Sequence, residues 1–286
     1  GDPVLTLIAQ AQADVDEASV RSIIAQYNLD QPVYRQYLIW AGTLLTGDLG
    51  RSIVNNQPVA DVLSSRLLPT LQIGLTAWVL TMLISIPVGA FTAAGKNTWK
   101  DWLGTSLSLV GAAMPYFLTA GLLIYVVALH LKWLPVSGYV SLFADPLQSI
   151  KTTILPALAL VLWLTANVTR QARSSFIEVL QLPYIRTARA KGLTEGQVMI
   201  GHAFKNAMLP IVTVLGLQLA QLVSGTVIIE TVFAVPGLGR LIVDAILARD
   251  YTVAQGVVLF FAFSILLINL LVDLAYGLFD PRVRKA

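Results

Sequence analysis

Few side chains in this sequence could perform covalent, hydrolytic or metal chemistry. The chain has no cysteine, which excludes disulfides, thiolate metal sites and a cysteine nucleophile. Its two histidines, His130 and His202, stand alone without metal-ligand spacing, so we expect no metal site. Neither the zinc-protease motif HExxH nor the nucleophile motif GxSxG occurs, and no carboxylates pair on adjacent turns. We therefore expect no catalytic residues.

The chain also lacks a phosphate-binding loop of the form GxxxxGK followed by Ser or Thr. The nearest sequence is Gly95-Lys96-Asn97, which has neither the upstream glycine nor the hydroxyl. The chain is therefore not expected to hydrolyse ATP, and any active process must draw its energy from a partner. Basic residues without interleaved aromatic side chains also argue against a nucleic-acid partner.

Composition places most of the chain in a membrane. Hydrophobic residues make up 56% of its 286 residues and charged residues 12%, against about 25% charge in soluble domains. A helix needs about 20 apolar residues to cross the bilayer core. Five stretches without Lys, Arg, Asp or Glu approach or exceed that length, and they are residues 67–95, 102–131, 152–169, 209–229 and 253–272. The sequence predicts an all-α polytopic membrane protein with five visible spans.

Residues 181–210 form a polar, basic island between two of these spans. Pro183 suits the first turn of a helix, and Gly192 can close that helix in a left-handed conformation. Thr194 and Gln197 match a capping box that opens a second helix running toward Pro210. We expect two short helices joined by an elbow, and a partner docked on that elbow.

The distribution of basic residues predicts which side each loop faces. If the C-terminus is cytoplasmic, eleven basic residues lie in cytoplasmic segments and four (Lys132, Lys151, Arg240, Arg249) in the short opposite loops. We therefore expect an external helical segment at 1–66, a transmembrane domain at 67–280 with a cytoplasmic loop at 170–208, and a cytoplasmic tail at 281–286. An external start requires an upstream span, so we expect a sixth, N-terminal helix to be missing.

Polar side chains inside the later spans are candidates for a translocation path. Gln218, Gln221 and Gly225 share one helical face, and Asn269 and Asp273 lie in the last span. Gly216, Ala220 and Ser224 form a stripe of small residues suited to close helix packing. We assign Gln218, Gln221, Ser224 and Asn269 to the path. An alternative stays open, in which the glutamines only bond across helices and Asp273 pairs with an arginine of the tail.

Several segments resemble the permease subunits of ATP-binding-cassette importers, and more narrowly the B-type inner-membrane permease of dipeptide and oligopeptide importers. The resemblance covers nearly the whole chain. It rests on GDPV at 1–4, LDQPVYRQY at 29–37, GDLGRS at 47–52, LPVSGY at 134–139, RTARAKG at 186–192, NAMLP at 206–210, PGLGRLIVDAI at 236–246, RDYTVAQG at 249–256 and NLLVDLAYGLFDPRVRK at 269–285. The broader permease signature has Glu-Ala-Ala before its glycine, whereas Arg186, Thr187 and Ala188 stand here, a departure that points to the peptide branch.

This resemblance implies a type I ABC importer permease fold with a cytoplasmic coupling helix that docks on an ATPase. The implied coupling residues are Tyr184, Ile185, Arg186, Thr187, Ala188, Arg189, Ala190, Lys191 and Gly192. The alternative is that the basic residues only set topology or bind anionic lipid. Glu230, Pro236, Gly237 and Gly239 would form an external gate or a contact with the binding protein, or only a plain turn.

The implied assembly contains a second, related permease subunit, two cytoplasmic ATPase subunits that bind ATP and Mg, and a periplasmic or lipid-anchored solute-binding protein. It would lie in the inner membrane of a bacterium or archaeon. The expected function is peptide import, with half of the pathway supplied by this chain. Glutathione or nickel complexes are alternative cargoes, and an ion-coupled secondary transporter is an alternative class, although only Asp273 offers a buried carboxylate for it.

Overall fold

The structure is a computed structural model, and it describes Ile24 and residues 30–279. The segment 1–4 and the tail at 281–286 lie outside the described residues. Helices account for the described fold, and the only β-pairing in this part is an isolated bridge between Arg51 and Pro58. The chain divides into two compact units. The first contains residues 1–66 and 241–259, and the second contains 67–240 and 260–286.

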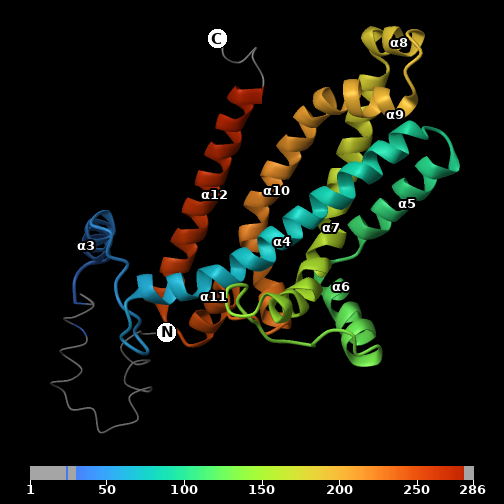
Figure 1. The fold of residues 1–286 in the computed structure, drawn as a ribbon. Coiled ribbons are helices and arrows are strands. Elements are labelled where there is room, and N and C mark those ends of the chain that lie inside the picture. Colours follow the sequence, from blue (N-terminus) through green and yellow to red (C-terminus); the bar gives the residue numbers. More distant parts are fainter. Residues whose placement is uncertain (1–23, 25–29, 280–286) are drawn as a thin grey trace. The chain divides into compact units, whose positions relative to one another are not determined.

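The second unit contains the helices that form the apolar body of the protein (Figure 1). They are the part of α4 (Val59–Ala94) that follows Arg66, α5 (Trp99–Ala113), α6 (Tyr116–Leu123), the π-helix η1 (Ile124–His130), α7 (Pro146–Leu180), α8 (Pro183–Ala190), α9 (Glu195–Gln197), the π-helix η2 (Val198–Ala203), α10 (Phe204–Val232) and the start of α11 (Leu238–Leu247). The later part of α12 (Tyr251–Phe279) also belongs to it.

Helix α7 lies at the centre of this unit, because α5, α6 and α10 all pack against it. In its most apolar window 67% of the residues are buried, more than in any other candidate span of the described chain. Small residues allow this close packing: a side chain at Gly89 of α4 would collide with Ala172, and one at Gly111 of α5 would meet the Leu162 carbonyl. The central position of α7 means that side chains along it are well placed to form sites.

The second expected span is not a straight helix. Residues 99–113 and 116–130 are both helical, but the two segments meet at an angle of 98°. Pro115 explains the break, because it disfavours helical backbone at the preceding Met114, whose ψ of 119° is extended. Four described helices can each cross a membrane, and this bent pair would make a fifth span. Hydropathy detected the apolar run but could not detect the bend.

Helix ends also differ from the ends of the apolar runs. Helix α4 begins at Val59 and α7 continues to Leu180, so residues 170–180 extend a spanning helix instead of opening a loop. Pro210 lies inside α10, so the second helix of the elbow does not end there but continues through η2 into α10. The absence of charge marks where lipid contact is favourable, whereas helices continue into charged sequence.

In the first unit, Asp250 organises the backbone. Its carboxylate accepts hydrogen bonds from the Ser52 hydroxyl and the Ile53 amide, and it caps the start of α12 by accepting from the Val253 amide at 3.3 Å. Asp250 is 5% exposed. The segments 47–52 and 249–256, far apart in sequence, are therefore joined through one carboxylate. This unit also contains α3 (Val33–Leu45).

Candidate functional site

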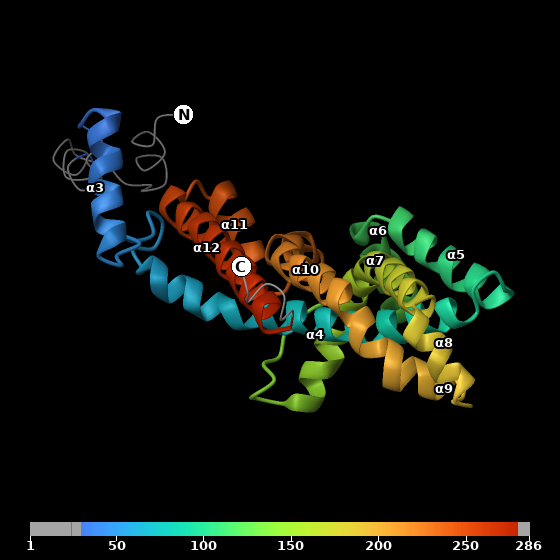
Figure 2. The same ribbon diagram turned by 90° about the horizontal axis from the view of Figure 1, so that it is seen from above.

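The elbow has the local geometry that its sequence predicts. Pro183 is the first residue of α8, Gly192 has φ +84° just beyond its end, and the capping box of Thr194 and Gln197 is formed in both directions. Pro183 has no backbone N–H to leave unpaired, and the other two features satisfy backbone groups that a helix terminus leaves without partners. Figure 2 shows α8 and α9 at one end of the second unit.

One face of α8 anchors the elbow and the other is exposed. Ile185 is fully buried and Ala188 is 6% exposed, in one apolar cluster with Ala93 of α4 and Phe176 of α7. Tyr184 adds a polar tie, since its hydroxyl accepts a hydrogen bond from Asn206 at 2.7 Å and donates one to the His202 carbonyl. Ile185 and Ala188 thus support the elbow from within and cannot contact a partner in this conformation.

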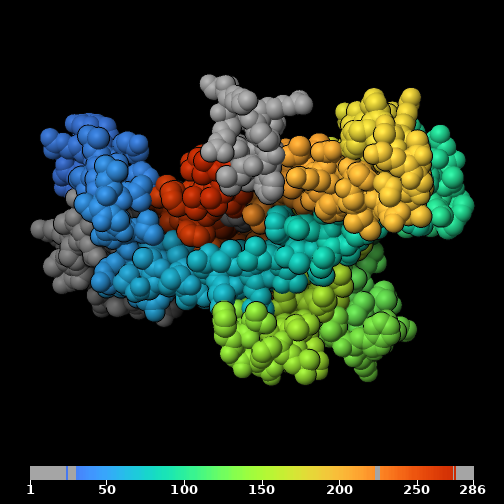
Figure 3. All heavy atoms as spheres, turned by 45° about the horizontal axis from the view of Figure 1, so that its top comes forward, coloured from blue at the N-terminus to red at the C-terminus, as the bar shows by residue number. Residues whose placement is uncertain are grey.

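The exposed face is basic and contains Arg186, Thr187, Arg189, Ala190, Lys191 and Gly192. Figure 3 shows the elbow at the molecular surface. Arg189 is occupied within the elbow, where its Nε and Nη2 lie 2.7 and 3.0 Å from the two carboxylate oxygens of Glu195. The hydrogen bonds that it donates to Glu195 raise the pKa of Arg189 above its usual value. The sequence did not predict this pair, which links α8 to α9.

A polar pocket of about 420 Å³ lies between α7 and α10. Its lining comprises Asn167, Arg170, Gln171, Val214, Leu217, Gln218 and Gln221. Gln218 is 4% exposed and donates a hydrogen bond from Nε2 to the Leu164 carbonyl at 2.9 Å, whereas Gln221 is exposed. Gln218 therefore bonds across helices and also lines a cavity, and its assignment to a translocation path stays a prediction.

One further path candidate lies elsewhere. Asn269 is half-buried on α12, outside this pocket. The side chains of Ser224, Gly225 and Asp273 fall outside the described ones. Gly216 packs closely against Val272 of α12, as expected of a small-residue stripe. Sequence periodicity did not indicate these lining residues of α7, because Asn167 is an isolated polar residue near the end of the uncharged run 152–169, and Arg170 and Gln171 follow that run.

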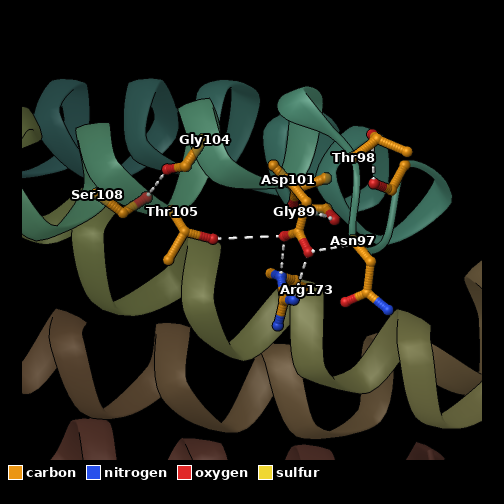
Figure 4. A network of polar contacts seen from close by, with 10 residues as sticks. Gly89, Asn97, Thr98, Asp101, Gly104, Thr105, Ser108 and Arg173 are labelled. Atoms are coloured by element: carbon orange, nitrogen blue, oxygen red, sulfur yellow. Dashed lines mark hydrogen bonds and ion pairs between the residues drawn. The ribbon is translucent and has the colours of Figure 1, made fainter.

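An ion pair that the sequence did not reveal joins α5 to α7 (Figure 4). Arg173 donates to both carboxylate oxygens of Asp101, at 2.5 and 2.8 Å. The same carboxylate accepts from the Asn97 amide at 3.0 Å and from the Thr105 hydroxyl at 3.4 Å. Asp101 is 7% exposed. Its spacing of 72 residues from Arg173 carries no local signal, so only the fold could bring the two together.

The residues expected at an external gate form a compact turn between α10 and α11. Glu230 has no exposed surface, and its carboxylate accepts hydrogen bonds from the Thr70 hydroxyl at 2.8 Å and the Arg240 amide at 3.0 Å. A side chain at Gly237 would collide with this carboxylate, and one at Gly239 would collide with the backbone of Val227. Pro236 is half-buried. In this conformation Glu230 holds the turn and offers nothing to a partner, while its assignment to a gate remains a prediction.

The fold and these sites define a class of protein. Residues 85–285 match the family model described as "Binding-protein-dependent transport system inner membrane component". The match covers more than half of the chain, and the chain belongs to this family of ABC importer permeases. It is therefore a multi-pass inner-membrane transport subunit and not an enzyme.

Relatives and solved structures agree with this assignment. The glutathione transport system permease protein GsiC of Escherichia coli K12 is 40% identical over 99% of this chain and 89% of its own length. A Brucella abortus protein, provisionally named as a peptide transport system permease, is 41% identical over 99% and 90%.

The fold resembles that of solved ABC transporters. The methionine transporter MetNI in an inward-facing conformation gives a TM-score of 0.63 at 17% identity, over 77% of this chain and 96% of the solved one. An amino acid ABC transporter crystallised with histidines gives 0.57 at 16% identity, over 76% and 94%.

Proposed function

We propose that this chain is the permease subunit of an ATP-driven importer for short peptides and that the elbow around α8 receives the force of ATP hydrolysis. The observation that carries this proposal is the elbow itself. It is an exposed basic helix, and its inner face is buried against α4 and α7. A displacement of α8 would be transmitted directly to α4 and α7, because Ile185 and Ala188 are packed in one apolar cluster with residues of both helices.

The docking surface is the outer face of α8. Arg186 and Lys191 supply positive charge, while Ala190 and Gly192 permit close approach of a partner backbone. Arg189 also helps to shape the elbow, since its guanidinium pairs with Glu195 of α9, and its role in coupling stays a prediction. ATP and Mg are bound by the partner ATPase chains, in keeping with the lack of a phosphate-binding loop here.

The proposed assembly contains two permease subunits, two ATPases and an external solute-binding protein. The family description supports a binding protein in general terms. We propose that the second permease is a related but distinct chain that supplies the other half of the pathway. The elbow and the C-terminus would face the cytoplasm, as the excess of basic residues predicts.

Peptides are the proposed cargo because relatives at about equal identity carry names of peptide and glutathione transporters. Glutathione is itself a short peptide with free carboxylates, so both names describe one chemical class. The pocket between α7 and α10 is polar and large enough for such a solute, within the range of about 300–1,000 Å³ typical of ligand sites.

Reconstitution in proteoliposomes tests this function. The chain, its partner subunits and the binding protein should accumulate a labelled dipeptide only when ATP is supplied on the side of the ATPases. Purification in mild detergent should recover the ATPases with this chain. Uptake that needs a proton or sodium gradient and no ATPase would replace the proposal with an ion-coupled transporter.

A further inference from the structure

The pocket between α7 and α10 combines a cation with an unsatisfied acceptor. Asn167, Arg170 and Gln171 approach it from α7, and Gln218 and Gln221 from α10. Five of its seven lining residues are polar, in helices otherwise dominated by apolar side chains. Polar groups inside a spanning bundle carry a cost in free energy, and they commonly mark the path of a polar solute.

Arg170 is the only charged residue in the pocket lining. Its Nη2 donates to the Asn167 amide oxygen at 2.6 Å, and among the described residues no carboxylate pairs with it. Arg173, one turn further along α7, by contrast donates to both carboxylate oxygens of Asp101. A guanidinium has five N–H donors in a planar fork that matches a carboxylate. Arg170 is thus oriented by Asn167 and retains donors for an anion.

Gln218 presents the complementary group. Its Nε2 is used by the Leu164 carbonyl, which fixes the amide and leaves Oε1 as an acceptor. This oxygen is buried and has no hydrogen-bond partner within the described residues. A buried acceptor without a donor destabilises the fold, because it has given up its hydrogen bonds to water. A ligand that brings an N–H group would remove this cost.

We propose that this pocket is a transit site for the C-terminal end of a peptide. The terminal carboxylate binds Arg170, and a peptide or amino N–H donates to Gln218 Oε1. The proposal rests on the proposed function and adds a recognition chemistry to it. A carboxylate paired with one exposed arginine and few apolar contacts binds weakly, as a transit site must so that the solute can leave.

The test measures protection of a single cysteine in the pocket. The chain has no cysteine of its own, so Leu217→Cys, at an exposed lining position, reports occupancy through its rate of alkylation by a maleimide. The assembled complex with cysteine-free partners, without the binding protein, is placed in nanodiscs of zwitterionic lipid. Alanyl-alanine and its C-terminal amide are then titrated as ligands. The free acid should protect at millimolar concentrations, and the amide about tenfold more weakly.

Substitutions in the pocket test whether the preference for the acid over the amide arises there. Arg170→Gln should abolish the tenfold difference between acid and amide, and Arg170→Lys should retain part of it. Gln221→Glu is an isosteric change at an exposed position, and it should weaken protection by the acid through like-charge repulsion. This variant provides the test if the Arg170→Gln complex fails to assemble. Lys96→Gln removes the same charge from the turn between α4 and α5, outside the pocket, and should change nothing.

Several results would overturn the proposal. They are no protection of the cysteine by either ligand, equal protection by the acid and the amide, or a preference for the acid that is unchanged in both Arg170→Gln and Gln221→Glu. The alkylation is repeated in nanodiscs that contain anionic lipid, and protection there that the acid does not change would instead assign Arg170 to a lipid headgroup. ATP-driven uptake by the same Leu217→Cys complex is measured separately in proteoliposomes with the binding protein, so a failure of the transport function is distinguished from a failure of this site.

Discussion

Gly192 shows how one backbone conformation can set the direction of a docking surface. Its φ of +84° turns the chain from α8 toward the capping box of α9, and no atom lies within 4 Å of where a Cβ would stand. Space is therefore available for a side chain there, and only the left-handed conformation opposes it. A substitution at Gly192 therefore tests the effect of backbone strain in the absence of steric collision.

Gly192→Val should reduce transport per ATP hydrolysed while leaving the apolar body folded. A β-branched residue at positive φ costs about 1–2 kcal/mol or more, so the elbow would rotate to relieve the strain. The ratio of dipeptide uptake to ATP hydrolysis in proteoliposomes measures this effect. Gly196→Val is the matched control, because Gly196 is equally unobstructed and has no positive φ. Normal coupling in Gly192→Val would refute the argument from the turn.

Arg189 and Glu195 should behave as a pair that sets the shape of the elbow. Arg189→Glu should lower recovery of the ATPases in purification, because two carboxylates would then meet between α8 and α9. The double variant Arg189→Glu with Glu195→Arg restores the attraction between the two side chains, which is worth about 0.2–1 kcal/mol for an exposed pair. It should therefore restore the recovery of the ATPases. If the double variant stays as poor as the single one, Arg189 acts by direct contact with the ATPase instead.

Helices α5 and α7 are held together at one point by Asp101 and Arg173. The bend at Pro115 separates α5 from α6, so α5 depends on this ion pair and on the close contacts around Gly104 and Gly111 to remain against its neighbours. The pair is partly shielded from solvent, with side-chain exposures of 30% for Arg173 and 10% for Asp101. Such a pair stabilises more than a fully exposed one.

Asp101→Asn should lower the stability of the detergent-solubilised chain by about 1–3 kcal/mol, because Arg173 would keep its charge without a carboxylate partner. The midpoint of thermal unfolding measures this. The double variant with Arg173→Gln should lose less than the sum of the two single variants, as expected for groups in contact. Asp61→Asn, at an exposed position on α4, is the control for loss of charge alone. Additive effects would show that the pair is not coupled.

The turn between α10 and α11 depends on the absence of a side chain at Gly237. A Cβ there would meet the Glu230 carboxylate and the Thr70 hydroxyl, which are both buried. Gly237→Ala should therefore lower the thermal midpoint and reduce uptake. Gly74→Ala is the control, since Gly74 is buried in α4 but has room for a methyl group. Equal stability of the two variants would show that the turn adapts without cost.

Over the whole molecule, local signals predicted local structure well. Uncharged length located the spanning helices, and the proline, glycine and capping box of residues 183–197 predicted the elbow in detail. Each of these features depends on residues a few positions apart, where sequence determines geometry directly. The expected membrane class, permease family and helical fold are confirmed by the family match and the structural resemblance.

Contacts between distant residues could not be predicted in this way. Asp101 and Arg173, Glu230 and Thr70, and Asp250 and Ser52 are each brought together only by the tertiary fold. Only the α10 side of the pocket was predicted. Helical periodicity selected Gln218 and Gln221, but it gave no reason to place Arg170 opposite them. A single sequence indicates which faces of its helices are polar, but it does not indicate which of these faces pack against one another.

The central claim is that the elbow docks on an ATPase, and site-specific photo-crosslinking tests it most directly. A photoreactive amino acid replaces Arg186, on the exposed face of α8, in the assembled complex. A second sample carries it at Trp133, an exposed position in the loop after η1. The account predicts a covalent adduct with the ATPase from position 186 and none from position 133. No adduct from position 186 in an active complex, or adducts of equal yield from both positions, would contradict it.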